Sequence, residues 1–142
     1  MTTAGELSRL LGPLRRTVLR ATRAAKNLPD LPEAQIELLR ALVEAGELSP
    51  SEAARQVQVA PSTISNLTRR MIAAGLVQRH TGEVDLRAVT LTPTTKAVDL
   101  LKRYDDASAD ILTLAIARLP VAEQKALTRA LPSLALLLTE LQ

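Results

Sequence analysis

The stretch Ala53–Leu67 reads AARQVQVAPSTISNL and predicts a helix-turn-helix. Ala54 is the small residue that such a motif needs where its two helices cross, and the turn is expected near Gln58. Pro61 opens the second helix, where its missing N–H costs nothing. The apolar positions expected to point inward are Ala53, Val57, Val59, Ile64 and Leu67.

The second helix of this motif is expected to run from Pro61 to a stop at Gly75. At about 100° per residue, Ile64, Leu67 and Met71 share one side. Hydroxyls, an amide and arginines lie opposite or at the flanks, namely Ser62, Thr63, Ser65, Asn66, Arg69 and Arg70. Such groups can read base edges and phosphates in a major groove. Taken alone, this face fits the solvated side of an ordinary amphipathic helix equally well.

Two short segments follow that read as strands, Leu76–His80 and Ala88–Leu91, around the polar tip 81–85. A helix-turn-helix followed by a two-stranded ribbon predicts a winged helix. Arg87, near the tip, is expected to enter a minor groove, where negative potential is concentrated. The alternative is an exposed arginine paired with Asp85 or Glu83, which contributes little.

Charge is distributed unevenly behind a net charge of +3. Four bases and no acid lie from Ala53 to Thr81, namely Arg55, Arg69, Arg70 and Arg79. This local basic stretch favours a polyanionic partner, whereas the net charge alone does not demand one.

Helical periodicity surrounds the winged-helix region. The first helix is expected from about Glu6 to Lys26, with a kink or a delayed start at Gly12-Pro13. The next is expected to begin at a cap on Asp30 or Leu31, with Pro32 in its first turn, and to end at Gly46. Its expected apolar stripe is Ile36, Leu39, Leu42 and Val43. Ser49 and Glu52 have capping-box spacing at the start of the third helix.

Two further helices are expected after the wing. Thr92-Pro93 is expected to cap the longer one, which Leu119-Pro120 ends. The last helix contains Pro132, so a kink or a restart is expected there. The residues expected to face inward on the longer helix are Val98, Leu101, Tyr104, Ile111, Leu112, Ala115 and Leu119.

Composition narrows the class of protein. Hydrophobic residues make up 46% of the 142 residues, yet Phe and Trp are absent and Tyr104 is the single tyrosine, so an aliphatic, mainly α core is expected. No cysteine and one histidine, His80, argue against disulfides, ordinary metal sites and thiol or Ser–His catalysis. The five glycines form no phosphate loop, so neither an enzyme nor a bound cofactor is expected.

Neither end of the chain has the pattern of a membrane-spanning segment or of a signal peptide. The longest apolar run near an end, Leu134–Leu138, is far shorter than the roughly 20 residues of a membrane span. Glu6 lies where the apolar part of a signal peptide would begin. We therefore expect a cytoplasmic protein with no membrane partner.

The sequence resembles the MarR family of bacterial transcription regulators. The resemblance covers nearly the whole chain and rests on Leu31–Gln35, Val59–Ser65, Ala73–Arg79, Asp85–Arg87 and Leu91–Pro93. It implies a dimerisation region of helices from 1–27 and 93–142 and a DNA-binding region over 28–92. It also implies a homodimer on palindromic double-stranded DNA, often released by a small phenolic or other lipophilic effector.

The chain departs from the family pattern at several positions. Gln58 stands where glycine is common, so a looser turn or a longer third helix is expected. Leu86 replaces a frequent arginine of the wing, and the strand after Arg87 looks about two residues short. Thr95 stands where glycine is frequent, without evident functional weight, and oxidation sensing by cysteine is excluded.

Three other features have simpler interpretations. His80 is expected to be a surface residue or a phosphate contact rather than a metal ligand. Asp105, Asp106 and Asp110 are expected to form a solvated face that pairs with Lys102 and Arg103. Tyr104 is expected in the core or a dimer interface, with its hydroxyl on a polar partner.

We therefore expect a dimeric DNA-binding regulator, most simply a repressor. The candidate DNA-binding residues are Ser62, Thr63, Ser65, Asn66, Arg69, Arg70, Arg79 and Arg87. The end helices carry apolar stripes suited to a dimer, namely Leu7, Leu10, Leu11, Leu14, Leu131, Leu134, Leu138 and Leu141. Pairing of these helices into a monomeric bundle is the alternative assembly. The alternative function is a helical dimeric module for protein contacts that has lost operator binding.

Overall fold

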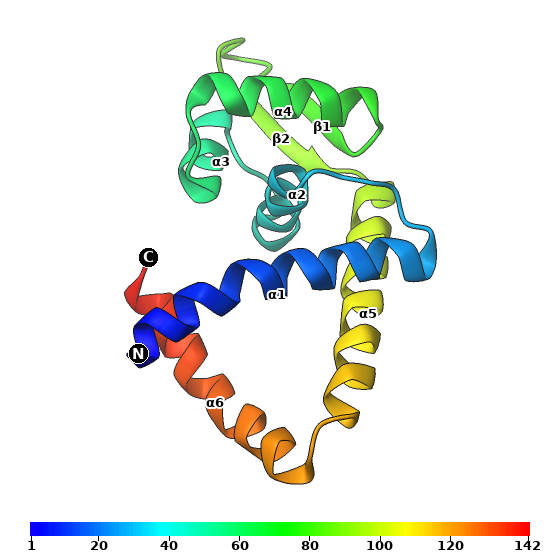
Figure 1. Ribbon diagram of the computed structural model, residues 1–142. Helices are drawn as coiled ribbons and strands as arrows, with labels where there is room; N and C mark the ends of the chain where they lie inside the picture. Colours follow the sequence, from blue (N-terminus) through cyan, green and yellow to red (C-terminus); the bar gives the residue numbers. More distant parts are fainter.

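The computed structural model describes residues 1–142 as six helices and one two-stranded sheet (Figure 1). The elements are α1 (Thr3–Lys26), α2 (Glu33–Ala45), α3 (Pro50–Val57), α4 (Pro61–Ala73), β1 (Val77–Thr81), β2 (Val89–Pro93), α5 (Thr95–Ala117) and α6 (Val121–Glu140). Helices α2 to α4 and the sheet gather at one end of the molecule, while α1, α5 and α6 extend from it. The mainly α winged-helix architecture is confirmed.

The core lies where α2 is surrounded by α3, α4, the sheet and the first half of α5. Leu38, Leu39 and Leu42 of α2 are fully buried, and they share one cluster with Ile64 and Met71 of α4. The expected stripe of α2 omitted Leu38 and included Ile36 and Val43, which are only half-buried. Helix α2 is enclosed on several sides, so its buried face is displaced from the stripe that periodicity indicated.

Local signals place most helix ends. The Ser49 hydroxyl accepts the Glu52 N–H at 3.2 Å and donates to the Glu52 carboxylate at 3.0 Å, with Pro50 as the first residue of α3. Gly46 ends α2 as expected, with φ at +81°. The expected start of α2 was wrong by one or two residues, because Pro32 itself is the cap and no side chain bonds there.

The start of α5 also differs from expectation. Pro93 pairs with Val77 as the last residue of β2, so Thr92 lies within the strand. Thr94 is the cap, because its hydroxyl accepts the Ala97 N–H at 3.1 Å and donates to the Gly75 carbonyl at 2.7 Å. This residue therefore joins the end of α4 to the start of α5.

Two prolines lie inside continuous helices. Helix α1 begins at Thr3, capped by the Thr2 hydroxyl, and runs through Pro13 without the delayed start that was expected. Helix α6 likewise runs through Pro132 without a restart. Both prolines are solvent-exposed, so water can satisfy the carbonyl that loses its helical partner. The break at Leu119-Pro120 is confirmed between α5 and α6.

Only the first half of α5 is buried. Its core residues are Ala97, Leu100, Leu101, Tyr104 and Ala107. Val98, Leu112 and Leu119, which were expected inside, are exposed.

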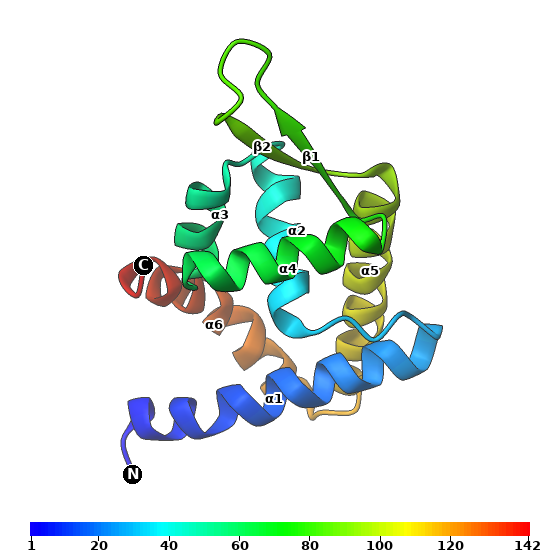
Figure 2. The same cartoon turned by 90° about the horizontal axis from the view of Figure 1, so that it is seen from above.

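Helix α6 has no buried residue and diverges from α5 in both views (Figures 1 and 2). In the single chain, therefore, α6 does not pack into a bundle with α1 and α5, and its leucines are left uncovered.

Candidate nucleic-acid interface

The turn between α3 and α4 is tight. Gln58 ends α3 in the left-handed conformation, with φ at +59°, and the Val59 N–H donates to the Ala54 carbonyl at 3.0 Å. Glutamine thus adopts the backbone that glycine would, so the looser turn or longer helix expected at this position is wrong. Ala54 is buried at the crossing, as predicted.

Helix α4 separates an apolar side from a polar side. Ile64 and Met71 are buried, and Leu67 packs against the core. Six candidate residues, Ser62, Thr63, Ser65, Asn66, Arg69 and Arg70, are all exposed. The expected division of this helix is therefore present in the structure.

Thr68 is a buried residue that the sequence argument missed. Its hydroxyl has no hydrogen-bond partner, although the residue is only 8% exposed. Its place one turn after Ile64 could have signalled burial, because residues four apart share a helix face.

The exposed side chains of α4 form few hydrogen bonds within the chain. The Arg69 guanidinium donates to the Asn66 side-chain oxygen at 3.3 Å, and the Ser65 hydroxyl donates to the Pro61 carbonyl at 3.2 Å. Both bonds are solvent-exposed and neither neutralises a charge. These side chains therefore remain available to an outside partner.

The wing is a regular antiparallel hairpin. Val77–Thr81 pairs with Val89–Pro93 over five residues on each side, so the second strand is not shortened as expected. Leu48, just before α3, exchanges two backbone hydrogen bonds with Leu91 at 2.8 and 3.0 Å. This bridge attaches the sheet to the helix-turn-helix, and the His80 ring bonds the Thr92 hydroxyl across the strands at 3.0 Å.

Two candidate arginines belong to the wing. Arg79 on β1 lines a hollow of about 280 Å³ together with Ser65 and Arg69 of α4. Arg87 lies in the exposed loop and forms no ion pair; the Asp85 carboxylate instead accepts its backbone N–H at 3.0 Å. Arg79 thus lies beside the polar side of α4. Arg87 belongs to the loop between β1 and β2, and this loop projects from the molecule (Figure 2).

All ion pairs of the chain lie away from this surface. Each involves α1, α2, α5 or the α1–α2 connection, and the partners are Arg15 with Glu33 and Glu37, Arg23 with Asp30, Arg40 with Asp105, and Lys102 with Asp106. The arginines of α3, α4 and the wing have no acidic partner. On the surface of α4 and β1, the positive charges of Arg69, Arg70 and Arg79 therefore have no ion-pair partner.

Asp105 has a different partner from the one expected. Its two oxygens accept hydrogen bonds from Arg40 of α2 at 2.8 and 3.1 Å, and not from Arg103. Hydrogen bonding to this carboxylate raises the pKa of the Arg40 guanidinium, against the opposing effect of partial burial. Asp106 does pair with Lys102, at 2.6 Å.

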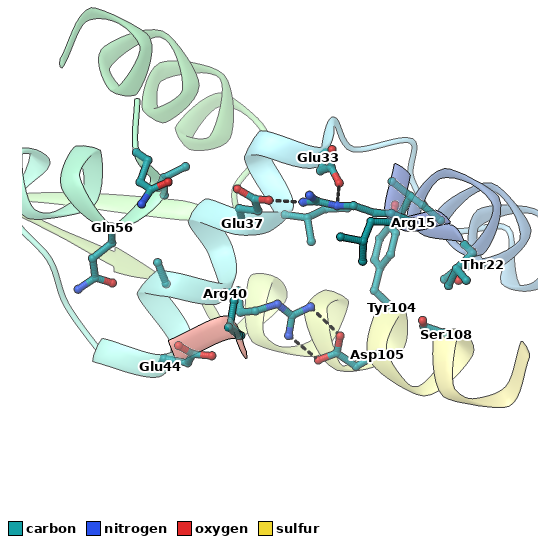
Figure 3. A pocket seen from close by; sticks show the side chains of 18 of the residues that line it. Arg15, Thr22, Glu33, Glu37, Arg40, Glu44, Gln56, Tyr104, Asp105 and Ser108 are labelled. Atoms are coloured by element: carbon teal, nitrogen blue, oxygen red, sulfur yellow. Dashed lines mark hydrogen bonds and ion pairs between the residues drawn. The ribbon is translucent and has the colours of Figure 1, made fainter. Parts of the chain in front are cut away.

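A cavity of about 1110 Å³ lies between the winged helix and the extended helices (Figure 3). Its walls come mainly from α1, α2, α3 and α5, and its apolar lining is aliphatic apart from Tyr104. The two ion pairs of Arg15 and the pair Arg40–Asp105 lie along it. The Tyr104 hydroxyl donates to the Pro29 carbonyl, so the expected buried tyrosine with a polar partner is confirmed.

The structure offers no candidate for two other kinds of site. The chain contains no group of three or more His, Cys, Asp or Glu side chains placed to hold a metal ion. None of its helices has the length and apolar character required to cross a membrane.

Comparisons with known proteins identify the relatives of this chain. Residues 31–89 match the model of the MarR family. No significant match is found among curated proteins.

Solved structures share the fold over nearly the whole chain. A MarR family protein from Bacillus stearothermophilus is 23% identical, with 98% of this chain and 99% of that chain covered at a TM-score of 0.77. A mutant of S. aureus MepR bound to an oligodeoxyribonucleotide is 19% identical, with 100% of both chains covered at a TM-score of 0.68.

A third structure concerns the regulation of DNA binding of Bordetella bronchiseptica BpsR by 6-hydroxynicotinic acid. It is 19% identical, with 95% of this chain and 96% of that chain covered at a TM-score of 0.63. The family model thus matches the helix-turn-helix and most of the wing, and the family's fold extends over the remaining helices. Residues 31–89 thus match the MarR family, and over nearly its whole length the chain has the fold of a MarR family protein.

Proposed function

We propose that this chain is a transcriptional repressor that binds a palindromic operator as a homodimer and leaves it when a small lipophilic molecule binds. The observation that carries the proposal is the surface formed by α4 and the wing. Its polar side chains are exposed, and none of its arginines has an acidic partner. Such a surface matches the acceptors and phosphates of a DNA groove.

The residues proposed to contact DNA divide into two groups. Ser62, Ser65, Asn66 and Arg69 are proposed to read bases in the major groove, with Thr63 and Arg70 at the flanks. Arg79 and Arg87 are proposed to hold the backbone and the minor groove.

The homodimer is supported by the uncovered leucines of α1 and α6. Leu10, Leu11, Leu131 and Leu138 are all at least half exposed in the single chain. Apolar surface of this extent is uncommon on monomers. Two half-sites about one DNA turn apart also require two recognition helices at a fixed spacing.

Release by a ligand is supported by the cavity. It is large enough for a drug-sized molecule, and it lies between the region proposed to bind DNA and the helices proposed to form the dimer. Regulation of BpsR by 6-hydroxynicotinic acid, in a protein of this fold, gives a precedent for small-molecule control. The apolar part of the lining, aliphatic except for Tyr104, favours a ligand with a lipophilic part.

The test begins with selection of a bound sequence from random double-stranded DNA. Arg69→Ala is expected to weaken binding to that sequence by about 5- to 150-fold, and to relax the preference at one position per half-site. Arg103→Ala is the matched control, because Arg103 is an exposed arginine of α5 outside the surface. An Arg69→Ala protein that binds selected and random DNA as the wild type does would remove α4 from the reading face.

Dimerisation is tested by light scattering. The wild type is expected to be a dimer at micromolar concentration, and Leu138→Asp to give a monomer or an unfolded chain, because a charge in a dry interface is costly. Circular dichroism distinguishes those two outcomes. A monomeric wild type would refute the dimer, and a dimer that selects no DNA sequence would favour the protein-interaction module instead.

A further inference from the structure

The loop at the tip of the wing is a closed turn. The Gly82 N–H donates to the Ala88 carbonyl at 2.7 Å, and the Ala88 N–H donates to the Asp85 carbonyl at 3.0 Å. The Asp85 carboxylate accepts the Arg87 N–H. These bonds hold both ends of residues 82–88 together, so the loop has a defined shape although it is exposed.

Gly82 makes this closure possible. A Cβ atom at this position would lie 2.6 Å from the Asp85 carbonyl oxygen and 3.1 Å from the Ala88 Cβ atom. The first of these distances is too short for any side chain, so another residue would open the turn. The closed backbone conformation of the tip therefore requires glycine at position 82.

The closed turn presents two apolar side chains to solvent. Val84 is fully exposed and Leu86 is 76% exposed. The loop projects away from the core, and the leucine-rich helices α1 and α6 lie toward the opposite end of the molecule (Figures 1 and 2). Neither the core nor a second copy joined through those helices would cover this tip.

The charges of the tip indicate how it binds. Glu83 and Asp85 oppose the single cation Arg87, so attraction to phosphates is not the main contribution of this loop. The tip nevertheless continues from β1, whose Arg79 lies beside Arg69 of α4, and neither arginine has an acidic partner. If Val84 and Leu86 contact the floor of a groove, their apolar surface is buried. The carboxylates of Glu83 and Asp85 can then point away from the phosphates.

We infer that the wing tip reads the floor of the minor groove by apolar contact, with Leu86 as the residue that determines specificity. This inference rests on the proposed function. Leu86 and Val84 pack against deoxyribose and base edges, and Arg87 lies beside them in the groove. The exocyclic amino group of guanine projects into the minor groove, so a leucine there favours A·T pairs on steric grounds.

The experiment uses the selected operator and changes only its minor groove. Replacing adenine by 2,6-diaminopurine at the flanks of each half-site adds the amino group, and replacing guanine by inosine removes it; both leave the major-groove pattern intact. Diaminopurine is expected to weaken wild-type binding by about fivefold or more, and inosine to strengthen it. Leu86→Ser is expected to lose most of this discrimination with an unchanged salt slope.

Two further variants complete the test. Leu114→Ser is the control, because Leu114 is an exposed leucine of α5. Leu86→Arg should steepen the dependence of log affinity on log salt by about one unit for each wing, because it adds a phosphate contact.

The binding measurements distinguish failure of this inference from failure of the proposed function. If Leu86→Ser discriminates as the wild type does, the apolar contact is refuted while the proposed function stands. If only Arg87→Ala removes the discrimination, the contact is cationic and the inference is wrong. If the wild type selects no DNA sequence, the proposed function itself fails.

Discussion

Replacing Gln58 by glycine should stabilise the protein without changing its shape. Gln58 holds the left-handed conformation, which costs a residue with a Cβ atom roughly 1–2 kcal/mol. Glycine removes this strain, but its greater freedom in the unfolded chain offsets roughly 0.5–1 kcal/mol. The side chain of Gln58 is exposed and makes no hydrogen bond, so little else is lost. We expect a net gain of roughly 0.5–1 kcal/mol in the free energy of unfolding.

Urea unfolding followed by circular dichroism measures this gain, at one fixed protein concentration because dimer stability depends on concentration. The thermal midpoint should rise by about 1–4 °C. Gly46→Ala is the mirror control: Gly46 has φ at +81° with no atom within 4 Å of an added Cβ, so its loss of stability reports backbone strain less the entropy that alanine removes from the unfolded chain. If Gly46→Ala destabilises while Gln58→Gly gives no gain, the strain assigned to Gln58 is absent. DNA affinity should stay unchanged, because glycine retains the turn.

Two other substitutions test individual contacts. Asp105→Asn should lower the free energy of unfolding by at most about 1 kcal/mol, because its pair with Arg40 is half exposed. The loss should shrink at high salt in the same urea titration, and a salt-independent loss would contradict an electrostatic origin. Thr68→Val should raise the free energy of unfolding by about 1 kcal/mol, because it removes a buried hydroxyl that has no partner. A destabilised valine variant in thermal unfolding would indicate that the hydroxyl does have a partner.

Helix ends, which depend on residues within one turn, were the features best predicted from the sequence. Ser49 with Glu52, Gly46 and the Leu119-Pro120 break all mark helix ends where they were expected, because caps and breaks act within one turn. The polar side of α4 was also predictable, because a helix of known start has a fixed period. The turn at Gln58 shows the limit of such reasoning, because the surrounding contacts hold glutamine in a glycine-like conformation.

Features set by distant contacts could not be predicted from the sequence. Arg40 pairs with Asp105 across 65 positions, whereas sequence spacing suggested partners on the same helix. Thr92 and Thr94 both border Pro93, and the strand pairing of Pro93 with Val77 decides that Thr94 is the cap. The apolar stripe of α5 is wider than its buried face, so periodicity alone could not show which residues the chain itself covers.

The partial burial of α5 also constrains how a ligand could release DNA. Its first half, as far as Ala107, belongs to the core together with α2, so that half must move with the winged helix. The ion pairs of Arg15 and Arg40 along the cavity are exposed, and each contributes about 0–1 kcal/mol. A ligand in the cavity therefore needs little free energy to break these ion pairs. It needs far more to separate the first half of α5 from the core. The second half of α5 and all of α6 lie outside this core, so a change in the spacing of the two recognition helices is expected to arise there, where it leaves the core intact.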